Sequence, residues 1–199
     1  MKKMGAGNTL YIAYGSNLNL GQMARRCPYA LAVGPAELSG YRLLFRGGNG
    51  SSVATVEPEE SSSVPVLLWE ITPRCEQALD YYEGWPRLYR KEMVTVSFAG
   101  KPMEAMVYIM NDGRPYGTPA KFYYEAIAEG YATAGFDLAV LDEAVAFSEE
   151  HSQANKYGDC LLCSNSMSVE DQFDYGTDRL FCVIKQEYVE ENDRCEEFN

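Results

Sequence analysis

The chain has 199 residues, 46% of them hydrophobic, with a formal net charge of −12 and a pI near 4.6. This size and apolar content suffice for one domain with a buried core plus an appendage, and the acidic charge argues against a nucleic acid or an anionic membrane surface as partner. No stretch approaches the ~18–20 apolar residues of a membrane span. The basic start Met1-Lys2-Lys3-Met4 lacks the apolar segment of a secretion signal, so we expect a cytoplasmic protein. Its six cysteines are then thiols or metal ligands rather than a disulfide framework.

The first informative segment is Tyr14-Gly15-Ser16-Asn17-Leu18, placed between a strand predicted over Leu10–Tyr14 and a short helix predicted over Leu20–Arg26. A Gly-Ser-Asn turn at such a place presents backbone N–H groups that nothing bulky covers. Together with the positive end of a helix, these groups hold an anion or a polarised carbonyl. An ordinary strand-to-helix turn is the alternative, because short motifs carry a real false-positive risk.

Short strands and turns are predicted as far as about residue 110. A Gly-rich segment over residues 47–52 lacks the Lys-Ser/Thr ending of a phosphate-binding loop, so we interpret it as a hairpin loop at the mouth of a site. The strands of this half are predicted over Ala30–Leu38, Tyr41–Arg46, Ser51–Val56, Val64–Glu70, Lys91–Phe98 and Met103–Met110, with a turn at Ser61-Ser62-Ser63.

A helix is predicted between the strands, with Thr72 as N-cap and Pro73 at its first position, ending before Gly84. Glu83 then stands at the negative end of this helix, a poor position for a charged carboxylate. Its aromatic neighbours are Tyr81, Tyr82, Trp85 and Tyr89. This setting should raise the proton affinity of Glu83, as a base or acid working near neutrality requires. The alternative is a solvent-facing glutamate, the commoner fate of that residue type.

Two further helices are predicted over Ala120–Thr133 and Leu138–Ser148, which makes the chain an α+β protein. The single histidine, His151, lies in a polar stretch that we interpret as a linker. A Ser-His-Asp or Cys-His machine needs its histidine in a structured pocket. The sequence therefore argues against a triad hydrolase.

The Tyr-Gly-Ser-Asn-Leu turn after the first strand, followed by Asp80-Tyr81-Tyr82-Glu83-Gly84 and a hairpin, resembles the gamma-glutamylcyclotransferase superfamily over about residues 9–147. The resemblance implies a small, closed or nearly closed mixed β-barrel with surrounding helices. It implies that Glu83 is the catalytic acid/base and that the turn binds the glutamyl part of a small-molecule γ-glutamyl substrate. A one-residue shift would exchange Tyr123 for its neighbour Tyr124. The implied substrate-binding residues are Tyr14, Gly15, Ser16, Asn17, Leu18, Tyr108 and Tyr123.

The chemistry of such a reaction requires no cofactor and no protein nucleophile. The α-amine of a γ-glutamyl amide can attack its own γ-carbonyl and close a five-membered ring, and good orientation is worth roughly 7–11 kcal/mol. One carboxylate can carry the protons, and a backbone N–H turn can stabilise the oxyanion. We expect release of 5-oxoproline from γ-glutamyl amino acids, glutathione or γ-glutamyl-lysine-type amines. A non-catalytic binding or regulatory module on the same fold is the alternative.

The composition changes near residue 150, so we predict a catalytic domain over residues 1–150 and an acidic, Cys-rich extension over residues 151–199. Four thiolates of the extension could bind a structural zinc ion tetrahedrally. The alternative is a small β appendage with buried or free thiols, since the spacing does not match two tight knuckles. The candidate ligands are Cys160, Cys163, Cys182 and Cys195. The sequence does not indicate an oligomeric state.

Overall fold

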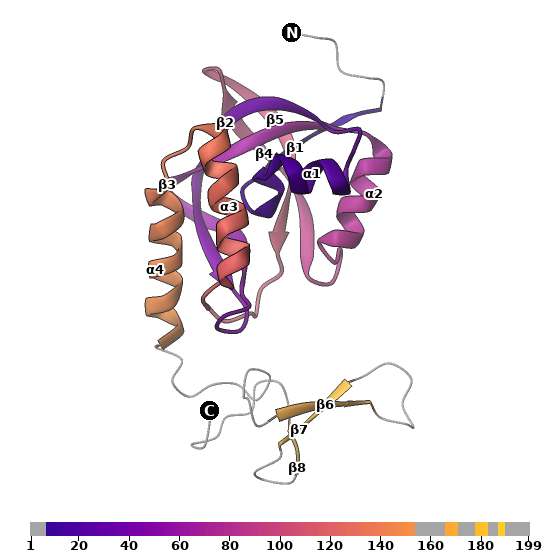
Figure 1. Ribbon diagram of the computed structural model, residues 1–199, viewed down its shortest axis with the longest axis vertical. Coiled ribbons are helices and arrows are strands. Elements are labelled where there is room, and N and C mark those ends of the chain that lie inside the picture. The colour runs from indigo at the N-terminus through magenta and orange to yellow at the C-terminus, as the bar shows by residue number, and fades with distance from the viewer. Residues whose placement is uncertain (1–6, 154–165, 171–177, 183–186, 190–199) are drawn as a thin grey trace. The chain divides into compact units, whose positions relative to one another are not determined.

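The structure is a computed structural model that describes residues 7–153 and three short strands, β6 (Ser166–Glu170), β7 (Asp178–Cys182) and β8 (Glu187–Val189). The chain divides into two compact units, Met1–Glu150 and His151–Asn199. In the second unit, β6, β7 and β8 form an antiparallel sheet in that order. The first unit contains a closed barrel and four α-helices (Figure 1).

Five strands close the barrel in the order β1–β3–β2–β4–β5. All neighbouring strands are antiparallel except β1 and β5, which run parallel, so the predicted mixed barrel is confirmed. Closure between β2 and β4 depends on the single pair Glu37 and Ser97. The bounds of the strands are β1 (Thr9–Ala13), β2 (Leu31–Arg46), β3 (Val53–Ile71), β4 (Tyr89–Phe98) and β5 (Lys101–Met110).

The hairpin of β2 and β3 is longer than the sequence predicted. The predicted turn at Ser61-Ser62-Ser63 is wrong, because these residues continue β3 and Ser63 pairs with Ser39 of β2. The pairing shifts register here, since Ser39 pairs with Ser63 and Tyr41 with Pro58, so that residues 59–62 of β3 stand opposite Gly40 of β2, which has φ +78°. The serine run therefore coincides with an irregularity of β3, but the irregularity is a bulge that interrupts the pairing without ending the strand.

The helices follow the sequence prediction closely. Thr72 caps α2 by accepting a hydrogen bond from the Cys75 amide at 3.2 Å, and Pro73 occupies the first position. The last helix extends beyond its predicted end, so His151 is helical and its assignment to a linker is wrong. The bounds are α1 (Leu20–Arg26), α2 (Pro73–Tyr82), α3 (Lys121–Ala134) and α4 (Ala139–Gln153). None of the helices in the described part of the chain is long and apolar enough to cross a membrane.

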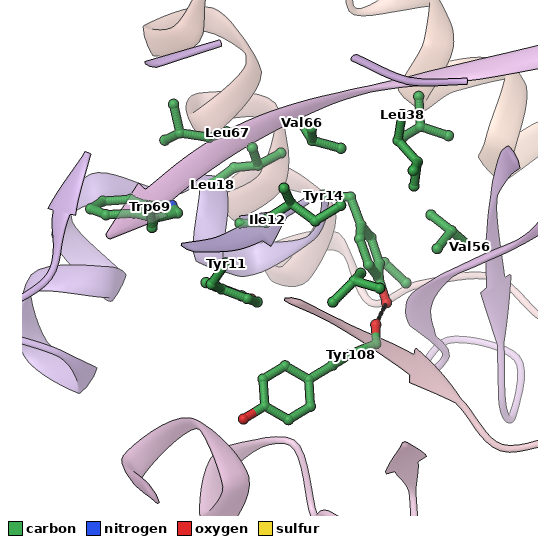
Figure 2. Packing of buried hydrophobic residues seen from close by; sticks show 14 of the residues in the cluster. Tyr11, Ile12, Tyr14, Leu18, Leu38, Val56, Val66, Leu67, Trp69 and Tyr108 are labelled. Atoms are coloured by element: carbon green, nitrogen blue, oxygen red, sulfur yellow. Dashed lines mark hydrogen bonds between the residues drawn. The ribbon is translucent and has the colours of Figure 1, made fainter. Parts of the chain in front are cut away.

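The core fills the barrel and continues under the helices. Tyr11, Ile12 and Ala13 of β1 are all buried, as in a strand covered on both faces. Figure 2 shows Tyr11 and Ile12 among the packed side chains. In β4, Val94 and Val96 are buried and alternate with exposed Met93, as a strand with one solvent face does. The barrel therefore offers a rigid frame at the end of β1, where the motif turn begins.

The predicted zinc ligands cannot be compared with this structure. Cys160, Cys163 and Cys195 lie outside the described residues, and Cys182 ends β7 in a region where side chains are not described. The zinc site stays a prediction. The two cysteines of the first unit, Cys27 and Cys75, are buried thiols.

The glycine at position 130, inside α3, allows that helix to approach the motif turn closely. A Cβ on Gly130 would lie 2.6 Å from Leu18 Cβ and 2.9 Å from the Leu18 carbonyl carbon. Glycine in a helix interior costs about 0.5–1 kcal/mol relative to alanine, so contact with the turn explains its presence better than helix propensity does.

We predict that Gly130→Ala lowers the free energy of unfolding by about 1–3 kcal/mol, the usual cost of overpacking, although alanine favours the helix. Urea unfolding measures the effect. The exposed position Ala132 on the same helix is the control, and Ala132→Gly should cost only about 1 kcal/mol through propensity. A Gly130→Ala protein as stable as the wild type would contradict the close packing.

Candidate active site

A cavity of about 180 Å³ opens where the end of β1, the start of β3, the end of α2 and the start of α3 meet. Six of its lining residues are tyrosines, which give it largely aromatic walls with hydroxyl groups at defined points. The others are three residues of the motif turn, one carboxylate and three apolar residues. The lining consists of Tyr11, Tyr14, Tyr82, Tyr89, Tyr108, Tyr123, Gly15, Ser16, Asn17, Glu83, Val53, Ala54 and Leu88.

The motif turn forms one side of this cavity. After β1 the chain makes a short 3-10 turn, η1 (Ser16–Leu18), in which the Leu18 amide donates to the Gly15 carbonyl at 2.9 Å. Because Leu18 is the first residue to bond back, the N–H groups of Ser16 and Asn17 have no acceptor within the turn. Leu18 itself is fully buried in the core and is not among the cavity residues (Figure 2).

Asn17 connects the turn to Glu83. Its side-chain amide donates to Glu83 Oε1 at 2.8 Å and to the Tyr11 hydroxyl at 2.9 Å, while its carbonyl oxygen accepts from Arg26 at 2.5 Å. Both amide hydrogens are thus used, and the orientation of the amide is determined by its partners. Asn17 is 3% exposed, so these bonds are shielded from water.

Glu83 is the residue at the C-terminal cap of α2, and its carboxylate lines the cavity. Desolvation by burial raises its pKa to about 7, against the smaller, opposing effects of the Arg26 charge and the hydrogen bond from Asn17. A carboxyl group with this pKa changes protonation near neutrality, so it can accept and return a proton there.

The aromatic setting of Glu83 differs in part from the sequence prediction. Tyr82 and Tyr89 line the cavity, but Tyr81 is 92% exposed and Trp85 46% exposed, and neither lines it. The Tyr89 hydroxyl donates to the Ala54 carbonyl at 2.7 Å. Burial raises the pKa of Tyr89 well above its usual value, so its hydroxyl stays protonated.

Arg26, at the end of α1, is hydrogen bonded to the motif turn and does not itself line the cavity. Its guanidinium stacks on the Tyr82 ring at 3.7 Å and donates to the Ser16 hydroxyl at 3.2 Å. The Ser16 and Tyr82 hydroxyls are also hydrogen bonded to each other at 3.0 Å. A positive charge at this place limits how far burial raises the pKa of Glu83.

The structure distinguishes Tyr123 from Tyr124. Tyr123 lines the cavity, and its hydroxyl accepts a hydrogen bond from the Ala54 amide at 3.3 Å. Tyr124 donates to Asp142 of α4 at 2.5 Å and is not a cavity residue. Tyr123, the position suggested by the resemblance, is therefore the one placed at the cavity.

Tyr14 and Tyr108 are coupled through the backbone. The Tyr14 hydroxyl donates to the Tyr108 carbonyl at 2.5 Å, as the dashed line in Figure 2 shows. The Tyr108 hydroxyl donates to Asp80 at 2.6 Å, and that carboxylate also pairs with Lys91 at 2.6 Å. The ring of Tyr108 therefore lines the cavity, while its hydroxyl is bound to a carboxylate of α2.

Sequence reasoning did not identify Tyr11 or Arg26 as site residues. Tyr11 lies three residues before the turn, within an apolar run that indicated only a core strand. Arg26 resembles the ordinary basic residue of a last helical turn. A single sequence does not indicate a site role for either residue, because each is hydrogen bonded to Asn17. The position of the Asn17 side chain is known only from the folded structure.

The Gly-rich loop connects β2 to β3, as predicted, but it does not line the cavity. Instead the Gly47 amide donates to the Pro115 carbonyl at 2.9 Å, and the Ser52 amide donates to the Thr118 carbonyl at 3.2 Å.

Within the residues that the structure describes, no three His, Cys, Asp or Glu side chains gather closely enough to hold a metal ion.

The fold and the site together define a class of protein. The family model described as gamma-glutamyl cyclotransferase, AIG2-like, matches residues 11–130, more than half of the chain, so the protein belongs to this family. No curated protein sequence matches the chain significantly.

Solved structures show the same fold. One described as a gamma-glutamyl cyclotransferase is 25% identical, with a TM-score of 0.61 over 69% of this chain and 86% of its own. An uncharacterized human protein is 23% identical, with a TM-score of 0.60 over the same shares. YkqA from Bacillus subtilis is 19% identical, with a TM-score of 0.62 over 71% of this chain and 54% of its own.

The raised pKa of Glu83 predicts a pH-dependent contribution to stability. Between its usual pKa of 4.5 and about 7, the folded state binds the Glu83 proton more tightly than the unfolded state does. The free energy of unfolding therefore falls as the pH rises through this window, because ionisation is costlier in the folded protein. Glu83→Gln cannot ionise and lacks this decline.

Denaturant unfolding of wild type and Glu83→Gln from pH 4 to pH 8 measures the effect, and the Gln variant should gain stability relative to the wild type as the pH rises. Glu143→Gln, which removes an exposed carboxylate from α4, is the matched control. Parallel curves for wild type and Glu83→Gln would show that the Glu83 carboxyl group is not desolvated in solution.

Proposed function

We propose that this protein is a cyclotransferase that releases 5-oxoproline and a free amine or amino acid from a γ-glutamyl amide. The observation that carries the proposal is one buried carboxylate, Glu83, with a pKa of about 7, in the same cavity as a turn whose Ser16 and Asn17 N–H groups have no acceptor among the described residues. Membership of the family supports it, as does the 25% identical structure described as a gamma-glutamyl cyclotransferase. A structure described as a yeast gamma-glutamyl cyclotransferase specific to glutathione shares the fold, at 14% identity.

The reaction balances without any external reagent. The α-nitrogen of the substrate forms a bond to the γ-carbonyl carbon, and the bond from that carbon to the leaving nitrogen breaks. Two protons leave the α-nitrogen as the ammonium becomes a ring amide, and the leaving nitrogen gains two as it becomes an ammonium. Glu83 carries them in turn, first as base and then as acid. Its pKa of about 7 suits both directions of transfer.

The motif turn stabilises the charge that develops on oxygen. Backbone N–H groups aimed at an oxyanion in a site that excludes water are worth far more than in bulk solvent, because they need no reorganisation. The N–H groups of Ser16 and Asn17 are the donors that the turn offers at the cavity. Their side chains are occupied by Arg26, Tyr82 and Glu83, which leaves binding to the main chain.

The tyrosines exclude water and shape the cavity. Burial raises the pKa of Tyr11, Tyr14 and Tyr123 above the usual value, so these hydroxyls remain neutral and add no negative charge beside Glu83. At about 180 Å³ the cavity is smaller than the ~300–1,000 Å³ of drug-sized ligand sites, so it suits the glutamyl moiety alone. A folded glutamyl chain in such a space brings its amine and γ-carbonyl together.

The test is 5-oxoproline release from a panel of γ-glutamylalanine, glutathione and γ-glutamyl-ε-lysine. We expect Glu83→Gln to fold and to lose turnover by roughly 10²–10⁴, the usual worth of general acid–base catalysis. In the wild type, kcat/KM should fall as the pH drops below about 7, because Glu83 must be ionised to accept the first proton. Glu143→Gln should turn over like the wild type. Tight binding of a panel member without product would favour the non-catalytic module instead.

The role of the turn gives a second test. A Cβ on Gly15 would lie 3.3 Å from Ala54 Cβ and 3.4 Å from the Tyr123 hydroxyl, so Gly15→Val places a branched side chain against both walls of the cavity. We expect at least a tenfold rise in KM, with weaker effects from Gly15→Ala. Ser16→Ala should be mild, since binding uses the backbone. Unchanged KM in Gly15→Val would indicate that the turn is structural only.

A further inference from the structure

A second hollow adjoins the catalytic cavity and shares two of its walls. This groove, of about 320 Å³, lies between α1 and α3 and contains Tyr82 and Tyr123, which also line the cavity. Figure 1 shows α1 and α3 on the same side of the barrel. The two hollows therefore share a wall formed by these tyrosines, so the groove is the hollow next to the cavity on this side of the molecule.

The groove is positively charged in an acidic protein. Its lining includes two guanidinium groups, Arg25 and Arg26, and no carboxylate, although the whole chain carries a net charge of −12. Arg25 is exposed and makes no hydrogen bond or ion pair with the residues that the structure describes. Such a cation next to a site favours an anionic ligand group.

The Arg26 guanidinium is held in place, and two of its N–H groups remain without an acceptor among the described residues. It donates to the Ser16 hydroxyl, to Asn17 Oδ1 and to Gln22 Oε1, which uses three of the five N–H groups of a guanidinium. Stacking on Tyr82 fixes its plane. A pre-organised guanidinium loses little conformational entropy when it binds a carboxylate, and Arg26 is such a group in the lining of the groove.

Stabilisation of the C-terminal end of α1 through the helix dipole does not explain the positions of both arginines. Basic residues in a last helical turn stabilise the C-terminal carbonyls, and Arg25 alone would fit that role. Arg26, however, reaches back to Gln22 and to the motif turn rather than toward the carbonyl end. Phe122 of α3, 76% exposed, lines the same groove and offers an apolar contact beside the two charges.

We propose that this groove binds the leaving group and selects substrates whose leaving group carries a carboxylate, such as γ-glutamyl amino acids and peptides, over γ-glutamyl amines without an acidic group. This inference rests on the proposed function, because the glutamyl moiety fills the small cavity and the rest of the substrate must lie beyond it. Arg25 and Arg26 recognise the carboxylate, and Phe122 contacts the side chain of the departing residue.

The test compares γ-glutamylalanine with γ-glutamylalaninamide, which have leaving groups of nearly the same shape but differ in charge. We expect the wild type to prefer the acid about tenfold in kcat/KM, as one charge-assisted hydrogen-bond pair provides. Arg25→Gln should lower that preference at least fivefold, and higher ionic strength should lower it in the wild type. Lys121→Gln, which removes an exposed cation from α3 outside the groove, should keep the preference.

A binding measurement separates this proposal from the cyclotransferase activity. Glu83→Gln protein, titrated with both compounds by calorimetry, should bind the acid more tightly than the amide, and Arg25→Gln in that background should reduce the difference. Equal kcat/KM for the two compounds in the wild type would overturn the groove assignment and leave the cyclotransferase proposal intact. Absence of 5-oxoproline from both would overturn the cyclotransferase proposal, and equal binding of the two compounds would then overturn the groove assignment as well.

Discussion

The hydrogen bond from Asn17 to Glu83 is the contact on which the site depends. It joins a turn that follows the first strand to the end of a helix 66 residues later. Through Asn17 the same contact extends to Tyr11 inside the barrel and to Arg26 outside it. A turn that binds substrate by its backbone needs its side chains occupied elsewhere, and these partners keep Asn17 in one orientation.

The same contact holds the proton affinity of Glu83 in a useful range. Burial alone raises its pKa, and the hydrogen bond from Asn17 and the charge of Arg26 reduce that rise, leaving a value of about 7. A more buried carboxyl group would hold its proton too tightly to act as a base, and a solvated one would be too weak a base to take a proton from an ammonium. The buried setting and the two polar partners therefore shift the pKa of Glu83 in opposite directions, and the proposed acid–base role depends on both.

The sequence predicted the elements whose ends carry local signals. Thr72 and Pro73 begin α2, and the helix over Leu20–Arg26 has its predicted bounds, because caps and breakers act over a few residues. The long β2–β3 hairpin was not predicted as two continuous strands, because the serine run interrupts the pairing as a bulge and does not end β3. A local signal therefore located the irregularity, but whether the strand ends or bulges there depends on the partner strand.

The site residues divide in the same way, into those with a local signal in the sequence and those whose role depends on distant contacts. Glu83 and the motif turn were proposed from their positions at element ends, where backbone groups and helix dipoles are readable from sequence. Tyr123 was separated from Tyr124 only by which face of α3 meets the turn, a contact that Gly130 makes possible. Arg26 carried no signal, since its role comes from a stacked tyrosine 56 positions away in the chain.

The small size of the cavity indicates that different residues would bind the glutamyl moiety and select the leaving group. A space of about 180 Å³ matches a glutamyl chain and little else, so under the proposed function the cavity recognises the part that all γ-glutamyl compounds share. Under the same proposal, discrimination between leaving groups comes from the groove next to Tyr82 and Tyr123. That groove contains two arginines, although the chain as a whole is acidic. The residues on α1 that face outward from the motif turn are therefore as informative about the substrate as those that surround Glu83.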